Sequence, residues 1–374
     1  MITDPIGLYI HIPYCVRKCH YCDFCSLPIG ADAVPDFYIE RLIDELSSYA
    51  EHGKIPVSTV YLGGGTPSLL TPEQMGKITS ATKYHFKFAE NIEFTIEANP
   101  GTVTEDKLKE YRTLGVNRIS LGLQSVHDTE LSSLGRIHNF DEFLSSYNTA
   151  RKCGFDNVSV DLMYGLPGQT LMSFTETLRS VIELAPEHIS VYGLILEEGT
   201  RFWQIKDRLP LPNEGTECDM YYLAAGLLRE AGYSHYEISN YAKPGFESKH
   251  NLKYWRAESY IGVGASAASY FLGKRYVNTH SVGAYISGKG LQYGTEEIPD
   301  RAGLMFEYAM MRLRLAEGIS FSEYKSRFDT DFLLGKKAIV NKLADCGLVS
   351  LSNDRLSLTE RGFYVSNAIL TEIL

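Results

Sequence analysis

Four of the seven cysteines of this 374-residue chain lie within one eleven-residue stretch, in the sequence YCVRKCHYCDFC at positions 14–25. Thiolates are soft ligands that bind zinc, copper(I) or iron–sulfur clusters. A structural zinc site usually takes two ligand pairs from separate segments, but the next cysteine here is Cys153. An odd number of cysteines also argues against a disulfide framework. The stretch therefore predicts an iron–sulfur site.

Two sets of three cysteines could supply the ligands. Cys19, Cys22 and Cys25 repeat as C-x2-C-x2-C, like the start of a ferredoxin run, but that run needs a fourth cysteine near position 29, which is Ile29. Cys15, Cys19 and Cys22 have the spacing C-x3-C-x2-C and follow a short apolar run. Three thiolates bind three irons of a cubane cluster and leave the fourth iron open to a ligand. We predict this second set, and the role of Cys25 stays open.

Short apolar runs alternate with helical patterns along the first half of the chain. The expected strands are 8–12, 57–62, 93–97, 118–124, 157–163 and 188–194, and the expected helices are 35–50, 71–86, 104–114, 141–152 and 171–184. Such repeats imply parallel strands joined by crossovers, and largely apolar strands are typical of a sheet covered on both faces. Glu97, Gln124 and Asp161 fall near strand ends, where α/β folds place their chemistry. We predict a partial (β/α)6 TIM-like barrel, with a doubly wound sheet as the alternative from pattern alone.

This rhythm ends near residue 200. A helix is expected at 219–231, followed by an aromatic, glycine-rich stretch at 233–270. The last 75 residues predict helices at 304–315 and 332–345, a two-stranded wing at 347–351 and 355–358, and a final helix, which together resemble a winged helix. We therefore divide the chain into the partial barrel (1–200), a middle region (201–299) and a winged-helix-like α+β module (300–374).

The C-x3-C-x2-C spacing, placed after the first strand of a barrel-like pattern, resembles the signature of the radical S-adenosylmethionine (SAM) superfamily. The resemblance implies a 4Fe–4S cluster whose open iron binds the amino and carboxylate groups of SAM. One electron then cleaves the sulfonium to methionine and a 5′-deoxyadenosyl radical. The residues that the resemblance places around SAM are Tyr9, Tyr21, Gly64, Gly65, Thr66, Glu97 at the amino group, Gln124, Arg136 at the carboxylate, and Asp161.

Longer motifs narrow the resemblance to the oxygen-independent coproporphyrinogen oxidase-like family. They are GGGTPS (63–68), EANPG (97–101), LGRIH (134–138) and DLMYGLPGQ (161–169). That family contains the oxidase itself and haem chaperones of the HemW type. The oxidase has a further cysteine two positions after the third, where this chain has Phe24, and a longer arm before the cysteines than the 14 residues found here. Both differences favour the chaperone branch.

A second motif points the same way. His250, Asn251, Tyr254 and Trp255 match the H-N-x-x-Y-W pattern of the chaperones. A neutral imidazole is a good ligand for haem iron, and the aromatic rings offer flat apolar faces to a porphyrin. The alternative is a packed aromatic turn in which His250 is a hydrogen-bonded core residue.

Two positions depart from the family pattern. Cys25 stands where chaperone relatives usually have Asn, which puts an extra thiol beside the cluster. Ala268 stands where the related stretch G-x-G-x-x-A-H-S has histidine. If that histidine contacts haem or substrate in relatives, the corresponding site is altered here.

Charge and composition limit the partners. The chain has 36 Lys and Arg against 46 Asp and Glu, a formal charge of −10, so no nucleic-acid partner is expected. No secretory signal is visible, and the uncharged stretch 259–273 is too short to span a bilayer, so we expect a cytoplasmic protein and leave a peripheral membrane contact open. The resemblance implies a haem chaperone that delivers haem to apo-haemoproteins and needs an electron donor. The alternatives are the decarboxylation of coproporphyrinogen III and another radical reaction on a tetrapyrrole.

Overall fold

Six parallel strands, joined by helices, form the centre of the computed structural model, which describes residues 3–30 and 32–374. In chain order they are β1 (Ile6–Ile12), β4 (Ile55–Gly64), β5 (Phe86–Ala98), β6 (Arg118–Gln124), β7 (Val158–Tyr164) and β8 (His188–Gly193), and each pairs with the next. They belong to a twelve-stranded sheet that ends in β14 (Tyr293–Glu297) on one side and β9 (Ser234–Glu237) on the other. The sheet does not close on itself, which confirms the predicted partial barrel.

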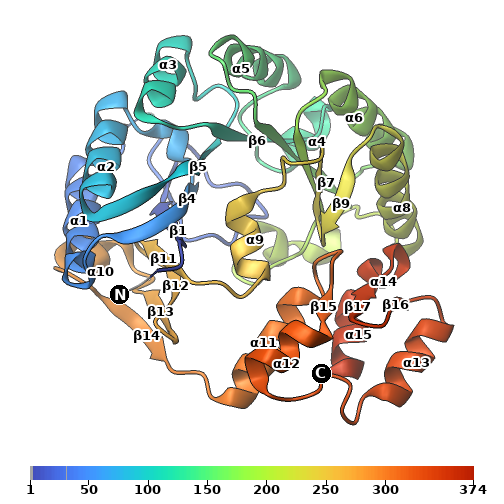
Figure 1. The fold of residues 1–374 in the computed structure, drawn as a ribbon. Helices are drawn as coiled ribbons and strands as arrows, with labels where there is room; N and C mark the ends of the chain where they lie inside the picture. The colour runs from blue at the N-terminus through green and yellow to red at the C-terminus, as the bar shows by residue number, and fades with distance from the viewer. Residues whose placement is uncertain (1–2, 31) are drawn as a thin grey trace.

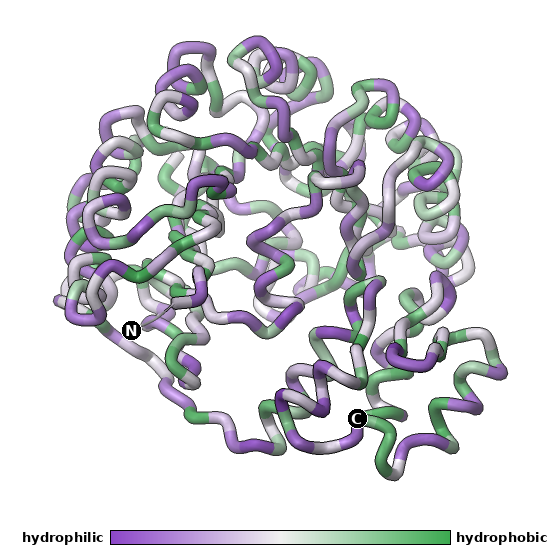
Figure 2. The backbone as a smooth tube through the Cα atoms, viewed as in Figure 1, coloured by the Kyte–Doolittle hydropathy of each residue, from purple (hydrophilic) through white to green (hydrophobic). Residues whose placement is uncertain are grey.

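Helices cover the outer face of this curved sheet (Figure 1). They are α1 (Asp36–Ser48), α2 (Pro72–His85), α3 (Glu105–Leu114), α4 (Asp128–Ser133), α5 (Phe140–Lys152), α6 (Leu171–Leu184) and α8 (Glu214–Glu230). Their starts follow from the sequence, since Thr71 and Asn139 form capping boxes at α2 and α5. Hydrophilic and hydrophobic residues alternate along these helices, as expected for elements with one buried face (Figure 2).

The strands alternate in polarity, and here the expectation of largely apolar strands was wrong. In β7, Val158, Val160 and Leu162 are fully buried in the core beneath the helices, whereas Ser159 and Asp161 line an internal cavity. Side chains on a strand point alternately to opposite faces, so a strand with one face toward helices and one toward a polar cavity needs this pattern. The inner face of the barrel is therefore polar.

The middle region extends the sheet at both edges. On one edge β11 (Tyr260–Val263) pairs in parallel with β1 and is followed by β12 (Ala268–Phe271), β13 (Lys274–Asn278) and β14. On the other edge β10 (Asn240–Ala242) pairs antiparallel with both β8 and β9. These strands are short and lie in the glycine-rich stretch and beyond it, where no strand was expected. Helix α10 (Val282–Ser287) joins the last two strands of the first edge, and the short α7 (Arg201–Gln204) precedes α8.

Helix α9 (Lys249–Trp255) lies inside the arc of the sheet rather than outside it (Figure 1). Its N-terminal N–H groups at Lys249 and His250 each donate to the carboxylate of Glu93, both at 3.0 Å, and Ser248 caps its first turn. It contacts β1 and β4, and also helix α11 (Arg301–Arg312) of the C-terminal module. Glu93 lies farther from the C-terminal end of β5 than Glu97 does. Because α9 is bonded to Glu93, it lies toward the end of the barrel opposite to the strand C-termini.

The C-terminal module has its own hydrophobic core, to which Tyr221 of α8 contributes. It contains α11 (Arg301–Arg312), α12 (Phe321–Phe328), α13 (Lys337–Asp345), α14 (Glu360–Tyr364) and α15 (Ser366–Ile373), with β15 (Ile319–Ser320), β17 (Arg355–Leu358) and β16 (Val349–Leu351) in one antiparallel sheet. The sheet has three strands where two were expected, and α12 was not expected. The three boundaries drawn from the sequence stay predictions.

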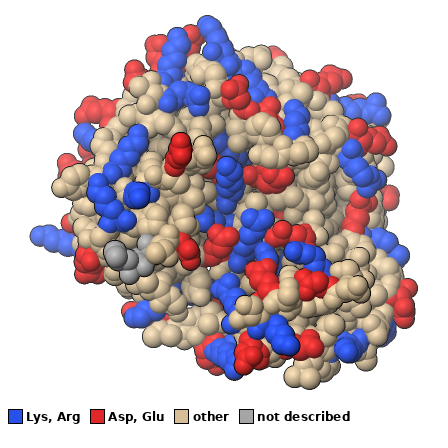
Figure 3. All heavy atoms as spheres, in the orientation of Figure 1, with Lys and Arg blue, Asp and Glu red and all other residues tan. Residues whose placement is uncertain are grey.

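Charged side chains of both signs are interspersed over the face seen in Figure 3. Across the described ranges, 3–30 and 32–374, no helix combines the length and apolar character that crossing a membrane requires.

Candidate functional site

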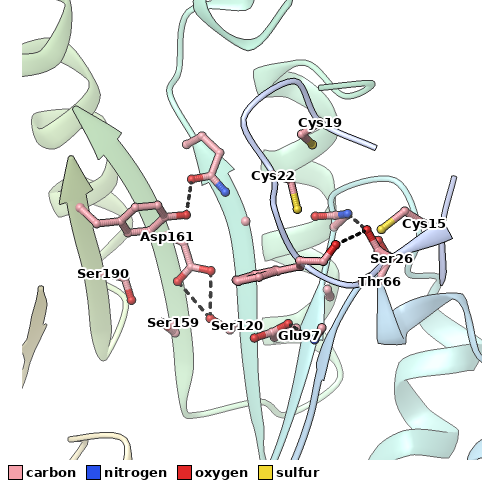
Figure 4. Close-up of a pocket in the computed structure, with 18 of the residues that line it drawn as sticks. Cys15, Cys19, Cys22, Ser26, Thr66, Glu97, Ser120, Ser159, Asp161 and Ser190 are labelled. Carbon is pink, nitrogen blue, oxygen red and sulfur yellow. Dashed lines mark hydrogen bonds between the residues drawn. The ribbon is translucent and has the colours of Figure 1, made fainter. Parts of the chain in front are cut away.

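A cavity of about 390 Å³ lies inside the open barrel (Figure 4). Its lining includes Cys15, Cys19 and Cys22 on one side and inward-facing residues of β5, β6, β7 and β8 on the other, with Asn251 of α9 also contributing. Of the nine predicted SAM contacts, all except Tyr9 line this cavity. The structure thus brings together predicted residues from six parts of the chain, which are the cysteine loop, the end of β4, Glu97, Gln124, Arg136 and Asp161.

The cysteine loop follows β1 and includes the two-residue strands β2 (Tyr14–Cys15) and β3 (Leu27–Pro28). Hydrogen bonds to main-chain carbonyls fix it: the His20 N–H donates to Leu134 O at 2.9 Å, and the Arg17 side chain donates to Gly135 O. In Figure 4 the sulfurs of Cys15, Cys19 and Cys22 lie across the cavity from β7 and β8. Cys25 does not line this cavity but a neighbouring one, and this placement favours the predicted set of three ligands.

Within the described residues, no three His, Cys, Asp or Glu side chains converge as they would around one metal ion. Ligands of a 4Fe–4S cluster bind different irons, so their sulfurs lie farther apart than ligands that share an ion. Three thiols on one loop, all facing one cavity, therefore fit a cluster better than a zinc ion.

The glycine-rich end of β4 packs directly against the cysteine loop. A Cβ at Gly65 would lie 2.6 Å from Tyr14 O and 2.8 Å from Ile12 O, and its N–H donates to Ile12 O at 2.9 Å. Gly64 has φ +108° and a Cβ there would lie 2.3 Å from the His11 ring. Only glycine permits both the close approach and this backbone conformation. The glycines thus set the distance between the two loops that form the cavity wall.

Arg136 lies beside the cysteines, immediately after the turn that holds their loop. One terminal nitrogen lies 3.6 Å from Cys19 Sγ, and the other donates to Asn99 Oδ1 at 2.8 Å and to Gly122 O. Its Nε is buried and has no hydrogen-bond partner among the described residues. A buried guanidinium with an unused donor, next to thiols, is suited to a negatively charged occupant.

Two acids reach the cavity from neighbouring strands. Glu97 accepts hydrogen bonds from the Tyr61 hydroxyl at 2.8 Å and the Gly64 N–H at 3.1 Å, and burial raises the pKa of its carboxyl to about 7. Asp161 accepts from the Ser120 hydroxyl at 3.1 Å, and burial raises the pKa of Asp161 as well. Burial makes both groups costly to ionise, so a ligand that donates hydrogen bonds to them would offset that cost.

Other predicted contacts are distributed as follows. Gln124 ends β6 with φ +76°, a conformation that non-glycine residues rarely adopt, and accepts a hydrogen bond from the Tyr192 hydroxyl at 3.0 Å. Tyr21 packs with the small cluster around Leu134 and lines the cavity. The Tyr9 hydroxyl instead forms a hydrogen bond with His11 Nδ1 at 2.9 Å, and Tyr9 lines the neighbouring cavity.

The predicted haem ligand His250 is fully enclosed. Its Nδ1 is 2.8 Å from Thr59 Oγ1 and its Nε2 is 2.7 Å from the Tyr254 hydroxyl, and burial lowers its pKa to about 3. With both ring nitrogens engaged, this conformation leaves none to bind iron. Trp255 lies at the end of α9, where the Arg314 guanidinium lies 5.9 Å from its ring centre. The geometry therefore supports the alternative interpretation, in which the H-N-x-x-Y-W segment is a packed element that closes the barrel.

Several cavity residues were missed from the sequence. Inward positions of β6, β7, β8 and β10 carry Arg118, Ser120, Ser159, His188, Ser190 and Asn240. Arg118 is 2% exposed and its Nε has no hydrogen-bond partner among the described residues. The period-two alternation of polar and apolar residues on these strands was the signal that could have found them.

Comparisons with known proteins agree with this geometry. Residues 9–181 match the radical SAM superfamily and residues 300–365 the HemN C-terminal domain. The chain is 37% identical to the heme chaperone HemW of Bacillus subtilis, over 98% of each chain, and 35% identical to that of Lactococcus lactis, over 100% of this chain and 98% of the relative. The corresponding protein of Escherichia coli is 39% identical over 86% of this chain and 85% of its own length.

A solved structure shares the fold. Coproporphyrinogen III oxidase (HemN) from Escherichia coli, a radical SAM enzyme, superposes with a TM-score of 0.85 at 24% identity, over 99% of this chain and 90% of its own. At that identity the likeness establishes the fold alone, whereas the curated relatives match at higher identity over nearly their full length. The chain belongs to the HemW family of heme chaperones, within the radical SAM superfamily.

Proposed function

We propose that this protein is a haem chaperone that carries a 4Fe–4S cluster and SAM, binds haem and delivers it to apo-haemoproteins. The observation that carries the proposal is the similarity to curated heme chaperones along practically the whole chain, at 37% identity with the Bacillus subtilis protein. The superfamily implies the cluster and SAM, and the relatives' name implies the cargo. The electron donor and the recipient proteins belong to the proposal.

The cavity fits both cofactors. Cys15, Cys19 and Cys22 would hold three irons, and when bound, the cluster supplies the electron that cleaves the SAM sulfonium. Arg136 holds an unused buried donor next to Cys19, which suits the SAM carboxylate. Glu97 and the Gly64–Gly65 backbone suit its amino group, since carboxylate and peptide carbonyl oxygens accept hydrogen bonds from an amine.

The remaining residues position and enclose these groups. Asp161, held by Ser120, is placed to accept hydrogen bonds from ribose hydroxyls. Gln124 is fixed by Tyr192 in a strained backbone conformation that turns it toward the cavity. Helix α9 closes the opposite end of the barrel through Glu93 and His250, which limits the entry of water from that side.

Iron counting, haem titration and haem transfer on a single preparation test the proposal. The full-length protein is reconstituted anaerobically with iron and sulfide, its iron is counted, and it is then titrated with haem and mixed with an apo-haemoprotein such as apomyoglobin. We expect about four irons per chain, a haem-dependent Soret band, and transfer of that band to the recipient. Conversion of coproporphyrinogen III to protoporphyrinogen by the same sample would instead establish the oxidase, and products from labelled SAM on another tetrapyrrole would establish a different radical enzyme.

A further inference from the structure

A second cavity, of about 830 Å³, lies beside the first, on the other side of the cysteine loop. The two share Lys18, Asp23, Phe24 and Ser26 of that loop, together with Gly64 and Glu97. Ligand and cofactor cavities span about 300–1,000 Å³. The first cavity is at the small end of this range and the second near the large end. The second cavity can therefore accept a larger ligand next to the cofactor site.

One wall of the second cavity carries His280, which follows β13 and is exposed. Its Nδ1 lies 2.5 Å from the Ser266 hydroxyl, and its Nε2 has no hydrogen-bond partner among the described residues. An imidazole that binds a metal commonly has its other nitrogen fixed by a hydrogen bond, which sets the ring orientation and the tautomer. His280 has this arrangement, whereas both nitrogens of His250 are engaged.

The segments that present His280 are held rigidly. Glu45, fully buried on α1, accepts hydrogen bonds from the Asn278 amide at 2.7 Å and from the Gly264 N–H at 3.1 Å. The Ser266 N–H donates to Thr279 O at 3.0 Å, and Ser266 has φ +64°. The network ties the loop before β12 to the segment after β13, so the Ser266 hydroxyl and the imidazole keep their relative position.

The cysteine loop gives this cavity a part of its wall that is apolar and exposed. Phe24 and Leu27 of the cysteine loop are 59% and 46% exposed, although both are large hydrophobic side chains. Val282 adds a buried apolar contact. Lys18, Asp23 and Glu97 bring side chains of both signs to this cavity, so charge does not select the ligand. A flat apolar molecule with a metal at its centre would cover the exposed side chains and meet the imidazole.

Cys25 and Ala268, the two positions that depart from the family pattern, also line this cavity. The Cys25 thiol donates to His280 O at 3.3 Å, so it contacts the backbone of the histidine rather than its ring. Ala268 is exposed and leaves space in the same wall.

From the size of the cavity, the oriented imidazole and the exposed apolar wall, we propose that haem binds in this second cavity with Nε2 of His280 as an axial ligand of its iron. The proposal rests on the proposed function, because it takes haem as the cargo, and it adds the site and the ligand. No bond is broken in this step, and the iron gains one nitrogen ligand from a neutral imidazole. Ser266 acts as a positioning residue through its hydrogen bond to Nδ1.

The test is a haemin titration of the anaerobically reconstituted full-length protein, followed by the Soret band and the iron–histidine stretch in the resonance Raman spectrum. The variants are His280→Ala, Ser266→Ala and Ala268→Trp, which fills the cavity from its wall. His52→Ala is the matched control, because His52 is an exposed histidine outside both cavities. Circular dichroism and iron content show that each variant is folded and loaded.

We expect Ser266→Ala to weaken haem binding by about tenfold. His280→Ala should weaken it further and should show no iron–histidine stretch, and added imidazole should restore a comparable iron–imidazole band. Ala268→Trp should also weaken binding, and His52→Ala should bind as the wild type does. A wild-type protein that does not bind haem would overturn the proposed function itself. Haem binding by the wild type with an unchanged spectrum in His280→Ala would overturn only this inference, as would loss of the stretch in folded His250→Ala alone.

Discussion

Glu97 makes the affinity for SAM depend on pH in a way that the structure predicts. Burial raises the pKa of this carboxyl to about 7, against an ordinary value of 4.5. Asp161 raises it further, whereas the Tyr61 hydroxyl, the Gly64 N–H and Arg118 lower it. We have proposed that the ionised carboxylate accepts a hydrogen bond from the SAM amino group. Protonated Glu97 must first lose its proton, so SAM should bind more weakly as the pH falls below 7.

The magnitude follows from the pKa. At pH 8 most of the carboxyl is ionised and at pH 6 only about a tenth is, so the Kd for SAM should rise about tenfold between them. Glu97→Gln should abolish this dependence and weaken binding at pH 8 by about 1.5–3 kcal/mol, or about 10- to 150-fold, the range for hydrogen bonds to charged groups. The folded protein holds the Glu97 proton up to a higher pH than the unfolded chain does, so ionisation of Glu97 costs stability as the pH rises from about 4.5 to 7. Glu97→Gln removes that cost and should be at least as stable as the wild type at pH 8.

The assay is anaerobic equilibrium dialysis of labelled SAM against reconstituted protein at pH 6, 7 and 8, with thermal unfolding measured on the same samples. Glu237→Gln is the matched control: Glu237 is also buried, with a pKa raised to about 7 by burial, but it does not line the cavity. It should keep the wild-type dependence. A wild-type Kd that is constant from pH 6 to pH 8, with iron content unchanged, would refute the role assigned to Glu97.

Three further predictions concern the glycine-rich loop, the cysteine ligands and the packing of α9. Gly65→Ala should lower iron content and destabilise the fold by about 1–3 kcal/mol in chemical denaturation, because the new Cβ would lie 2.6 Å from a main-chain oxygen. Gly76→Ala is the control: its Cβ would meet only a side-chain carbon at 3.9 Å, so this variant should be neutral or slightly stabilising. Cys15→Ala should remove the brown chromophore and Cys25→Ala should retain it; the reverse outcome in iron and sulfide counts would reassign the ligands. His250→Ala should destabilise the protein by about 2–4 kcal/mol in urea unfolding, because it leaves a buried cavity and removes the hydrogen-bond partner of the Thr59 and Tyr254 hydroxyls. Unchanged stability would contradict the packing role of His250.

Much of the first cavity could be predicted because its residues come in short motifs with fixed spacing. The C-x3-C-x2-C run, the GGGTPS loop and the acids at strand ends are local patterns, and the ends of parallel strands meet at one edge. Arg118 and His188 could not be predicted in the same way. Neither belongs to a motif of fixed spacing, and only the curvature of the sheet brings the inward positions of successive strands around one space.

The H-N-x-x-Y-W segment shows the limit of motif reasoning. Its composition suits a haem contact, and the sequence cannot tell a ligand from a packed residue. The answer depends on Thr59, 191 positions earlier in the chain, whose hydroxyl occupies one nitrogen of the His250 ring. Likewise, nothing near His280 in the sequence indicates a site, because the oriented ring results from Ser266 and from the hydrogen-bond network around Glu45.

The sequence by itself predicted the three cysteine ligands and the order of the six central strands and their helices. It also supplied the glycines that permit the cysteine loop to approach β4, since each of these features depends on residue type and local spacing. Tertiary structure alone decided which strands bring their polar faces around one space, which of His250 and His280 keeps a ring nitrogen open, and that two cavities share the cysteine loop. These features arise from contacts between segments far apart in the chain, and such contacts depend on how the sheet curves and where α9 and β12 pack, which no local pattern encodes.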